Sequence, residues 1–94
     1  MIELGTKVVV TTDKRGVFFG ILAARDGSTV ELGDARNCVY WSAETRGFLG
    51  LCAHGPQPGS RVGPAAPLVE LRGVTSVSVA SDEAVKAWEA APWK

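Results

Sequence analysis

Short runs of alternating apolar and polar residues, separated by polar turns, dominate the first 41 positions. The stretch Lys7 to Thr12 is β-branched and apolar, which predicts a strand covered at least partly on both faces. Asp13 to Gly16 is polar and ends in glycine, as hairpin turns commonly do. Val17 to Ala24 predicts a second strand, with Gly20 as its bending point. The chain is therefore expected to begin with a curled hairpin.

The same pattern predicts two more strands immediately afterwards. Asp26-Gly27 forms a turn, and Thr29 to Leu32 then alternates polar and apolar residues, as a half-buried strand does. Gly33-Asp34-Ala35 reads as another turn, followed by a fourth strand from Arg36 to Trp41. Strands therefore account for about residues 6–41.

The segment from residue 42 to residue 67 differs in character. Its second half, PQPGSRVGPAAP, is rich in proline and glycine, which predicts an irregular loop. Its first half is expected to hold one short helical turn or strand, around Phe48 to Ala53. A loop of this length in a small domain is commonly functional or disordered.

The end of the chain predicts two further strands and a helix. Residues 68–72 and 75–79 alternate, with Gly73 between them. Ser81 is a suitable N-cap for a helix over about 82–91, whose Trp88 repeats at helical spacing with its apolar neighbours. We therefore predict one mainly β domain over 1–94: a small curled β-barrel of five or six strands with a C-terminal α-helix.

Composition excludes some classes of function. Ten basic and ten acidic side chains cancel, so no overall positive charge attracts nucleic acid. There is no 18-residue apolar run and no basic segment that leads into an apolar stretch, so we expect no membrane span, no signal peptide and a cytoplasmic location. The middle third is cationic, with three arginines against Glu44 alone.

The sequence carries little sign of catalysis. Phosphate-binding loops, nucleophile elbows and dinucleotide fingerprints are all missing, so no catalytic residue and no cofactor is predicted. One histidine and two cysteines make a metal site improbable, and Cys38 and Cys52 are expected to be reduced, buried thiols. A metal-independent phosphodiesterase that uses His54 with Arg46 or Lys14 remains an alternative.

Cations and flat rings gather in the irregular middle of the chain. A site for a phosphorylated, nucleotide-like ligand needs both, because guanidinium groups bind phosphate and aromatic rings stack on bases. Each residue also has a plainer role, since Trp41 and Tyr40 suit a core, and arginines or hairpin lysines suit water. The candidate ligand-binding residues are Lys14, Arg15, Arg36, Tyr40, Trp41, Arg46, His54 and Arg61.

A self-association surface is also expected. Hydrophobic residues make up 46% of the chain, which is more than 94 residues comfortably bury, and three of them are tryptophans. Shared interfaces between identical copies solve this problem. We therefore predict a homo-oligomer.

The run VFFGILAARDGSTVELGDARNCVYW resembles the first motif of Sm-like proteins, in which a bent strand with a central glycine leads through an acidic turn into an alternating strand. Phe18, Gly20, Asp26, Val30 and Asp34 are among the positions that match. The resemblance implies a small Sm-like or SH3-like barrel. It also implies RNA as an alternative partner.

Nearly the whole chain is also similar to a family of small uncharacterised proteins of bacteriophage and prophage genomes. The segments TTDKRGVFFG, TRGFLGLCAHGP and EAVKAWEAAPW carry this resemblance. It implies an origin in phage and a location in the host-cell cytoplasm. By analogy with short phage proteins, it also implies an oligomer that sequesters a nucleotide second messenger of host immunity, such as a cyclic dinucleotide or an ADP-ribose derivative.

Overall fold

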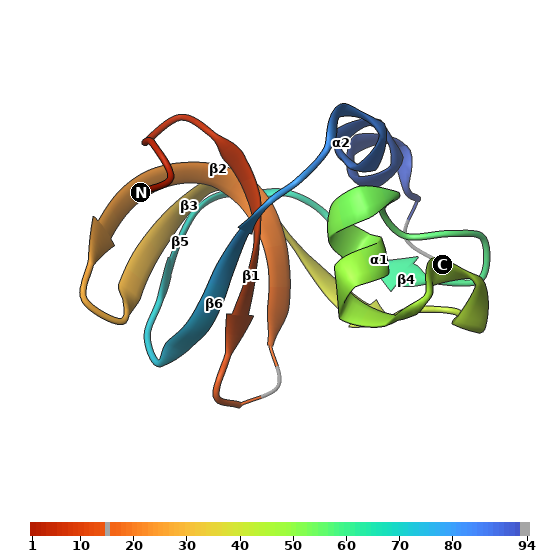
Figure 1. The fold of residues 1–94 in the computed structure, drawn as a ribbon, viewed down its shortest axis with the longest axis horizontal. Helices are drawn as coiled ribbons and strands as arrows, with labels where there is room; N and C mark the ends of the chain where they lie inside the picture. Colours follow the sequence, from red (N-terminus) through yellow and green to blue (C-terminus); the bar gives the residue numbers. More distant parts are fainter. Residues whose placement is uncertain (15, 93–94) are drawn as a thin grey trace.

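The computed structural model describes residues 1–14 and 16–92, which form a strongly curved sheet with helices against one side (Figure 1). Arg15, Trp93 and Lys94 lie outside the described residues. The helical segments are a 3₁₀ turn, η1 (Ala43–Thr45), and two α-helices, α1 (Gly47–Ala53) and α2 (Asp82–Ala90). The strands are β1 (Lys7–Thr12), β2 (Val17–Asp26), β3 (Thr29–Tyr40), β4 (Arg61–Val62), β5 (Ala66–Leu71) and β6 (Val74–Val79).

All six strands belong to one antiparallel sheet. Its order is β4-β3-β2-β1-β6, and β5 pairs with β3 as well. Within residues 1–14 and 16–92 no ladder joins β5 to β6, so the curled sheet stays open between them. The predicted fold class, mainly β with six strands and a C-terminal helix, is confirmed.

The turn expected at Gly33-Asp34-Ala35 was wrong, because β3 runs through it without interruption. Phe19 pairs with Arg36 and Ile21 with Gly33, so β3 carries one extra residue there and forms a β-bulge. The bulge places Asp34 in the left-handed region, at φ 48°. Gly20 faces it, and a Cβ on Gly20 would lie 2.9 Å from the Gly33 carbonyl oxygen. The role of Gly20, where a bend was predicted, is therefore to allow this close approach of β2 and β3.

Apolar side chains form two clusters, and β1 contributes to both. Val8 and Val10 join Leu22 and Leu32 in the cluster enclosed by the curl of the sheet. Val9, on the opposite face of β1, joins the cluster between the sheet and the two α-helices. All three valines are fully buried, which confirms that β1 is covered on both faces.

The segment 42–67 is more regular than expected, since it contains η1, α1, β4 and the start of β5. Of the two alternatives around Phe48 to Ala53, the helix is the one that forms. Its Leu51 and Cys52 are buried in the cluster under the helices. Gly50 permits the tight entry into α1, because a Cβ there would lie 1.6 Å from the Thr45 carbonyl oxygen.

The C-terminal helix forms close to its predicted bounds and covers the sheet. Ser81 caps it, as expected, by accepting a hydrogen bond of 3.0 Å from the Ala84 amide. Trp88 is fully buried, and its ring stacks on Phe19 with centroids 5.2 Å apart. Its indole Nε1 donates to the Leu51 carbonyl oxygen at 3.0 Å, which ties α2 to α1. Neither α-helix, nor any other helix of the described residues, is long and apolar enough to cross a membrane.

Candidate functional site

Arg36 lies on β3, and its guanidinium group binds backbone carbonyl oxygens rather than open solvent. Its Nε donates to Gly63 at 2.7 Å, and its two terminal nitrogens donate to Trp88 at 2.5 Å and to Ala91 at 2.6 Å. Burial lowers the pKa of Arg36 from its ordinary value. The acceptors at Trp88 and Ala91 are carbonyls at the C-terminal end of α2, where a cation is favoured. Arg36 therefore holds α2 against the sheet.

A hollow of about 410 Å³ adjoins Arg36, between the sheet and the end of α2. Lys7 and Glu89 line it and form an ion pair at 2.7 Å. Asp34, at the bulge, lines it as well. The cations here face carboxylates or carbonyl oxygens, so this hollow offers little free positive charge to a phosphate.

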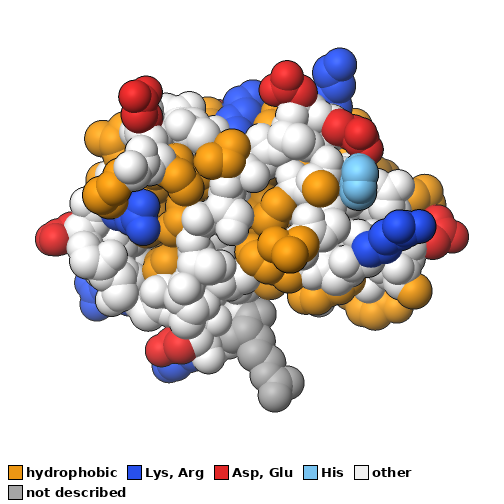
Figure 2. Space-filling model, viewed as in Figure 1, with side chains coloured by type: hydrophobic (Ala, Val, Ile, Leu, Met, Phe, Trp, Pro, Cys, Tyr) orange, Lys and Arg blue, Asp and Glu red, His pale blue; other side chains and the backbone are white. Residues whose placement is uncertain are grey.

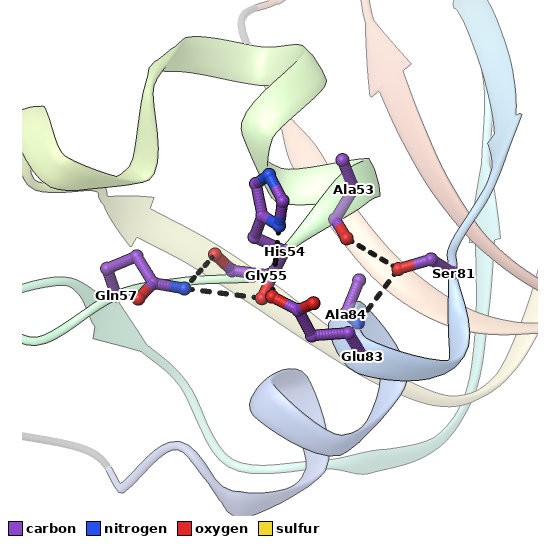
Figure 3. Close-up of polar contacts among 7 residues, drawn as sticks. All are labelled: Ala53, His54, Gly55, Gln57, Ser81, Glu83 and Ala84. Carbon is purple, nitrogen blue, oxygen red and sulfur yellow. Dashed lines mark hydrogen bonds and ion pairs between the residues drawn. The ribbon is translucent and has the colours of Figure 1, made fainter.

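His54 follows α1 directly and pairs with the first turn of α2 (Figure 3). Its Nδ1 lies 2.9 Å from Glu83 Oε2, while Ser81 Oγ donates to the Ala53 carbonyl oxygen at 2.6 Å. In Figure 3 the other ring nitrogen of His54 points away from this cluster. The imidazole is at the surface with an acidic side chain beside it (Figure 2). His54 thus contributes to the junction of the two helices.

The remaining predicted site residues are dispersed. Trp41 is half-buried and packs against the cluster under the helices. Arg46 is exposed between η1 and α1, at φ 66°. Lys14 lines a separate hollow of about 440 Å³ between the β1–β2 hairpin and the β5–β6 turn. Arg15 lies outside the described residues.

Tyr40 and Arg61 are the two predicted residues that the structure does bring together. They face each other directly across the β3–β4 ladder, although they are 21 positions apart in the sequence. The side chain of Tyr40 is 57% exposed, and Arg61 is exposed as well. Both line a hollow of about 430 Å³, together with Val39 and Gly59. No hydrogen bond or ion pair within the described part of the chain occupies the Arg61 side chain.

Val39 and Gly59 were not anticipated as parts of this hollow. Val39 is 60% exposed, although its place in an alternating strand suggested an ordinary apolar position. The pairing of Arg61 and Val62 with β3 lies within a proline- and glycine-rich stretch that gives no strand signal. The juxtaposition of Tyr40 with Arg61 depends on this pairing, so only the residue types were available from the sequence.

The two thiols are buried and unpaired, which confirms their predicted state. Burial raises the pKa of Cys38 to about 11, against a weaker opposite effect of a backbone hydrogen bond at Tyr40. Burial also raises the pKa of Cys52. Both changes disfavour the reactive thiolate. Over residues 1–14 and 16–92, no group of three or more histidine, cysteine, aspartate or glutamate residues is arranged to hold a metal ion.

Comparison with protein families gives a match over residues 5–88, which includes every strand and nearly all of α2. The chain belongs to this family, which is described as a domain of unknown function, DUF6948. A search of curated proteins finds none that matches the chain. The family description assigns no activity.

Proposed function

We propose that this chain is a non-catalytic binding protein for a small phosphorylated, nucleotide-like ligand, and that it holds the ligand at the Tyr40–Arg61 hollow. The phenol ring of Tyr40 offers a face on which a base can stack. The planar guanidinium of Arg61 offers paired N–H donors to a phosphate. A cation and a flat ring, both exposed and opposite each other in one ladder, carry this proposal.

Compared with the predicted pocket, the proposed site is smaller. Arg36, which was expected in it, is bound to carbonyl oxygens, and His54 is paired with Glu83. Neither lines the hollow of Tyr40 and Arg61. Arg61 therefore supplies the cation of the proposed site, and Tyr40 supplies the ring.

The wider biological role belongs to the same proposal. In this role the chain comes from a phage or prophage, acts in the host-cell cytoplasm and sequesters a nucleotide second messenger of antiviral signalling, such as a cyclic dinucleotide or an ADP-ribose derivative. The chain self-associates to do so. Exposed apolar side chains at Leu49, Leu68 and Val79 support self-association, as do the apolar patches on the face shown in Figure 2.

Isothermal titration with AMP, ADP-ribose, cyclic di-AMP and a short RNA tests the binding proposal. At least one nucleotide should bind the wild-type chain, and Tyr40→Ala should weaken that binding by about ten- to a hundredfold, because one stacking contact is lost. Tyr40→Phe, which keeps the aromatic ring, should retain nucleotide binding. Arg61→Gln should weaken binding, while Arg25→Gln, a matched change of an exposed arginine near the β2–β3 turn, should not.

The outcomes separate the candidate functions. Selective binding of the RNA, unaffected by the Tyr40 and Arg61 variants, would replace the proposal with the Sm-like alternative. Recovery of a cleaved ligand after incubation, detected by mass spectrometry, would replace it with a phosphodiesterase. Absence of nucleotide binding across the titrations would reject it. Sedimentation at micromolar concentration tests the homo-oligomer, and a monomer there would reject that part.

A further inference from the structure

A second hollow adjoins the Tyr40–Arg61 hollow on the other side of the loop 56–60. It has a volume of about 340 Å³ and lies between this loop and the C-terminal end of α2. Gly59 lines both hollows. Gly59 has no side chain, so it presents only its backbone to each of them. We call the second hollow the proline–alanine groove, after Pro56, Pro58, Ala87, Ala90 and Pro92 in its lining.

The groove presents apolar walls and no charged side chain. Its two polar side chains already have partners. Gln57 Nε2 donates to the His54 and Gly55 carbonyl oxygens, each at 3.2 Å (Figure 3), and Ser60 Oγ accepts from the Ser42 amide at 3.1 Å. The groove is therefore complementary to a flat, weakly polar group rather than to a phosphate.

Each hollow alone is at the lower end of the range of about 300–1,000 Å³ that small-molecule sites occupy. One nucleoside with its phosphate suits a hollow of this size, whereas a ligand with two base-bearing ends needs both. Arg61 is the cation in the lining of the first hollow, and the lining of the second contains none. This places the charged centre of a ligand beside Arg61 and leaves only an uncharged ring for the groove.

We propose that the ligand of this protein is a dinucleotide. This inference rests on the proposed function and extends it. One nucleoside stacks on Tyr40, the bridging phosphate binds Arg61, and the base of the second nucleoside lies in the proline–alanine groove beyond Gly59. Dinucleotides should consequently bind more tightly than mononucleotides of the same base.

Paired titrations of AMP and the dinucleotide pApA test this. Wild-type protein should bind pApA about tenfold or more tightly than AMP. Ala90→Phe, which fills the groove from an exposed position at the end of α2, should remove that advantage and leave the AMP affinity within about twofold. Ala23→Phe, a matched change at an exposed alanine of β2, should change neither affinity. Tyr40→Ala should weaken both.

Amide chemical-shift mapping on the wild-type chain gives a readout that does not depend on any variant folding. Titration with pApA should shift the signals of Gly59, Ala87 and Ala90, whereas AMP should leave the two alanine signals in place. Equal affinities for AMP and pApA, or unchanged alanine signals with pApA, would overturn the dinucleotide inference while the Tyr40–Arg61 site stands. If neither compound nor any other nucleotide binds, the proposed function itself fails.

Discussion

Two arginines in the middle of the chain, Arg36 on β3 and Arg61 on β4, differ in whether the protein itself binds their guanidinium groups. Arg36 lies where β3 passes the end of α2, and carbonyl oxygens from two segments satisfy its guanidinium group. Arg61 lies at the sheet edge beside the exposed ring of Tyr40, and the described residues offer it no acceptor. The comparison shows that the ends of nearby helices and loops, more than residue type, decide whether an arginine is structural or available to a ligand.

The largest effect should come from replacing the arginine that binds carbonyl oxygens. Arg36→Lys should lower the free energy of unfolding by about 2–3 kcal/mol, because an ammonium group lacks the planar fork and leaves carbonyl oxygens at the end of α2 unsatisfied. Arg61→Lys should change it by less than about 0.5 kcal/mol, since that side chain is exposed. Urea unfolding monitored by circular dichroism measures the free energy of unfolding of both variants. Equal losses of stability would show that the two arginines do not differ in structural importance.

An intermediate effect is expected at Cys38, which lies on β3 between these two regions. Its pKa in the folded chain is about 11, above the ordinary value of 9.0 for an unperturbed thiol. Folding is therefore favoured by the neutral thiol below pH 9, and that contribution is lost as the pH rises from about 9 to 11, by up to about 1.4 kcal/mol per pH unit. The difference in unfolding free energy between wild type and Cys38→Ala should fall across this window. A constant difference would contradict the buried-thiol assignment.

The smallest effect should come from His54 and Glu83, which join the two helices at the surface. Their side chains are 55% and 69% exposed, so solvent screens the interaction between them. A double-mutant cycle of His54→Ala and Glu83→Gln should give a coupling energy of about 0.2–1 kcal/mol, which decreases in high salt. A coupling as large as the Arg36 effect would mean that this junction, rather than Arg36, holds α2 in place.

Local patterns were sufficient for most of the fold. β1, β6 and the Ser81 cap all follow from alternation, turn residues and capping, which act over a few positions, whereas the same patterns left helix and strand open around Phe48 to Ala53. The bulge at Asp34 was missed because Gly-Asp-Ala is equally suitable for a turn, and only the packing of β2 against β3 beside Gly20 selects the bulge. A two-residue strand such as β4 is too short to show an alternation of apolar and polar residues.

The candidate site was harder to predict because it depends on contacts between distant segments. The sequence supplied the residue types, a cluster of arginines and rings in the middle third. Nothing local indicates that carbonyls of α2 approach Arg36, or that Arg61 pairs opposite Tyr40. Two residues of the same type were therefore assigned to one pocket, although the fold separates them.

The extra residue in β3 also changes which positions of that strand, even or odd, face the interior of the curl. Even-numbered Val30 and Leu32 share the interior of the curl with odd-numbered Ala35, so beyond Asp34 the even positions Arg36 and Cys38 turn toward the helices. Deleting Asp34 would restore a regular count and exchange the two faces of everything that follows. A guanidinium would then enter the interior and the last helix would lose its anchor, so length variation should be far less tolerated here than in the loop 56–60.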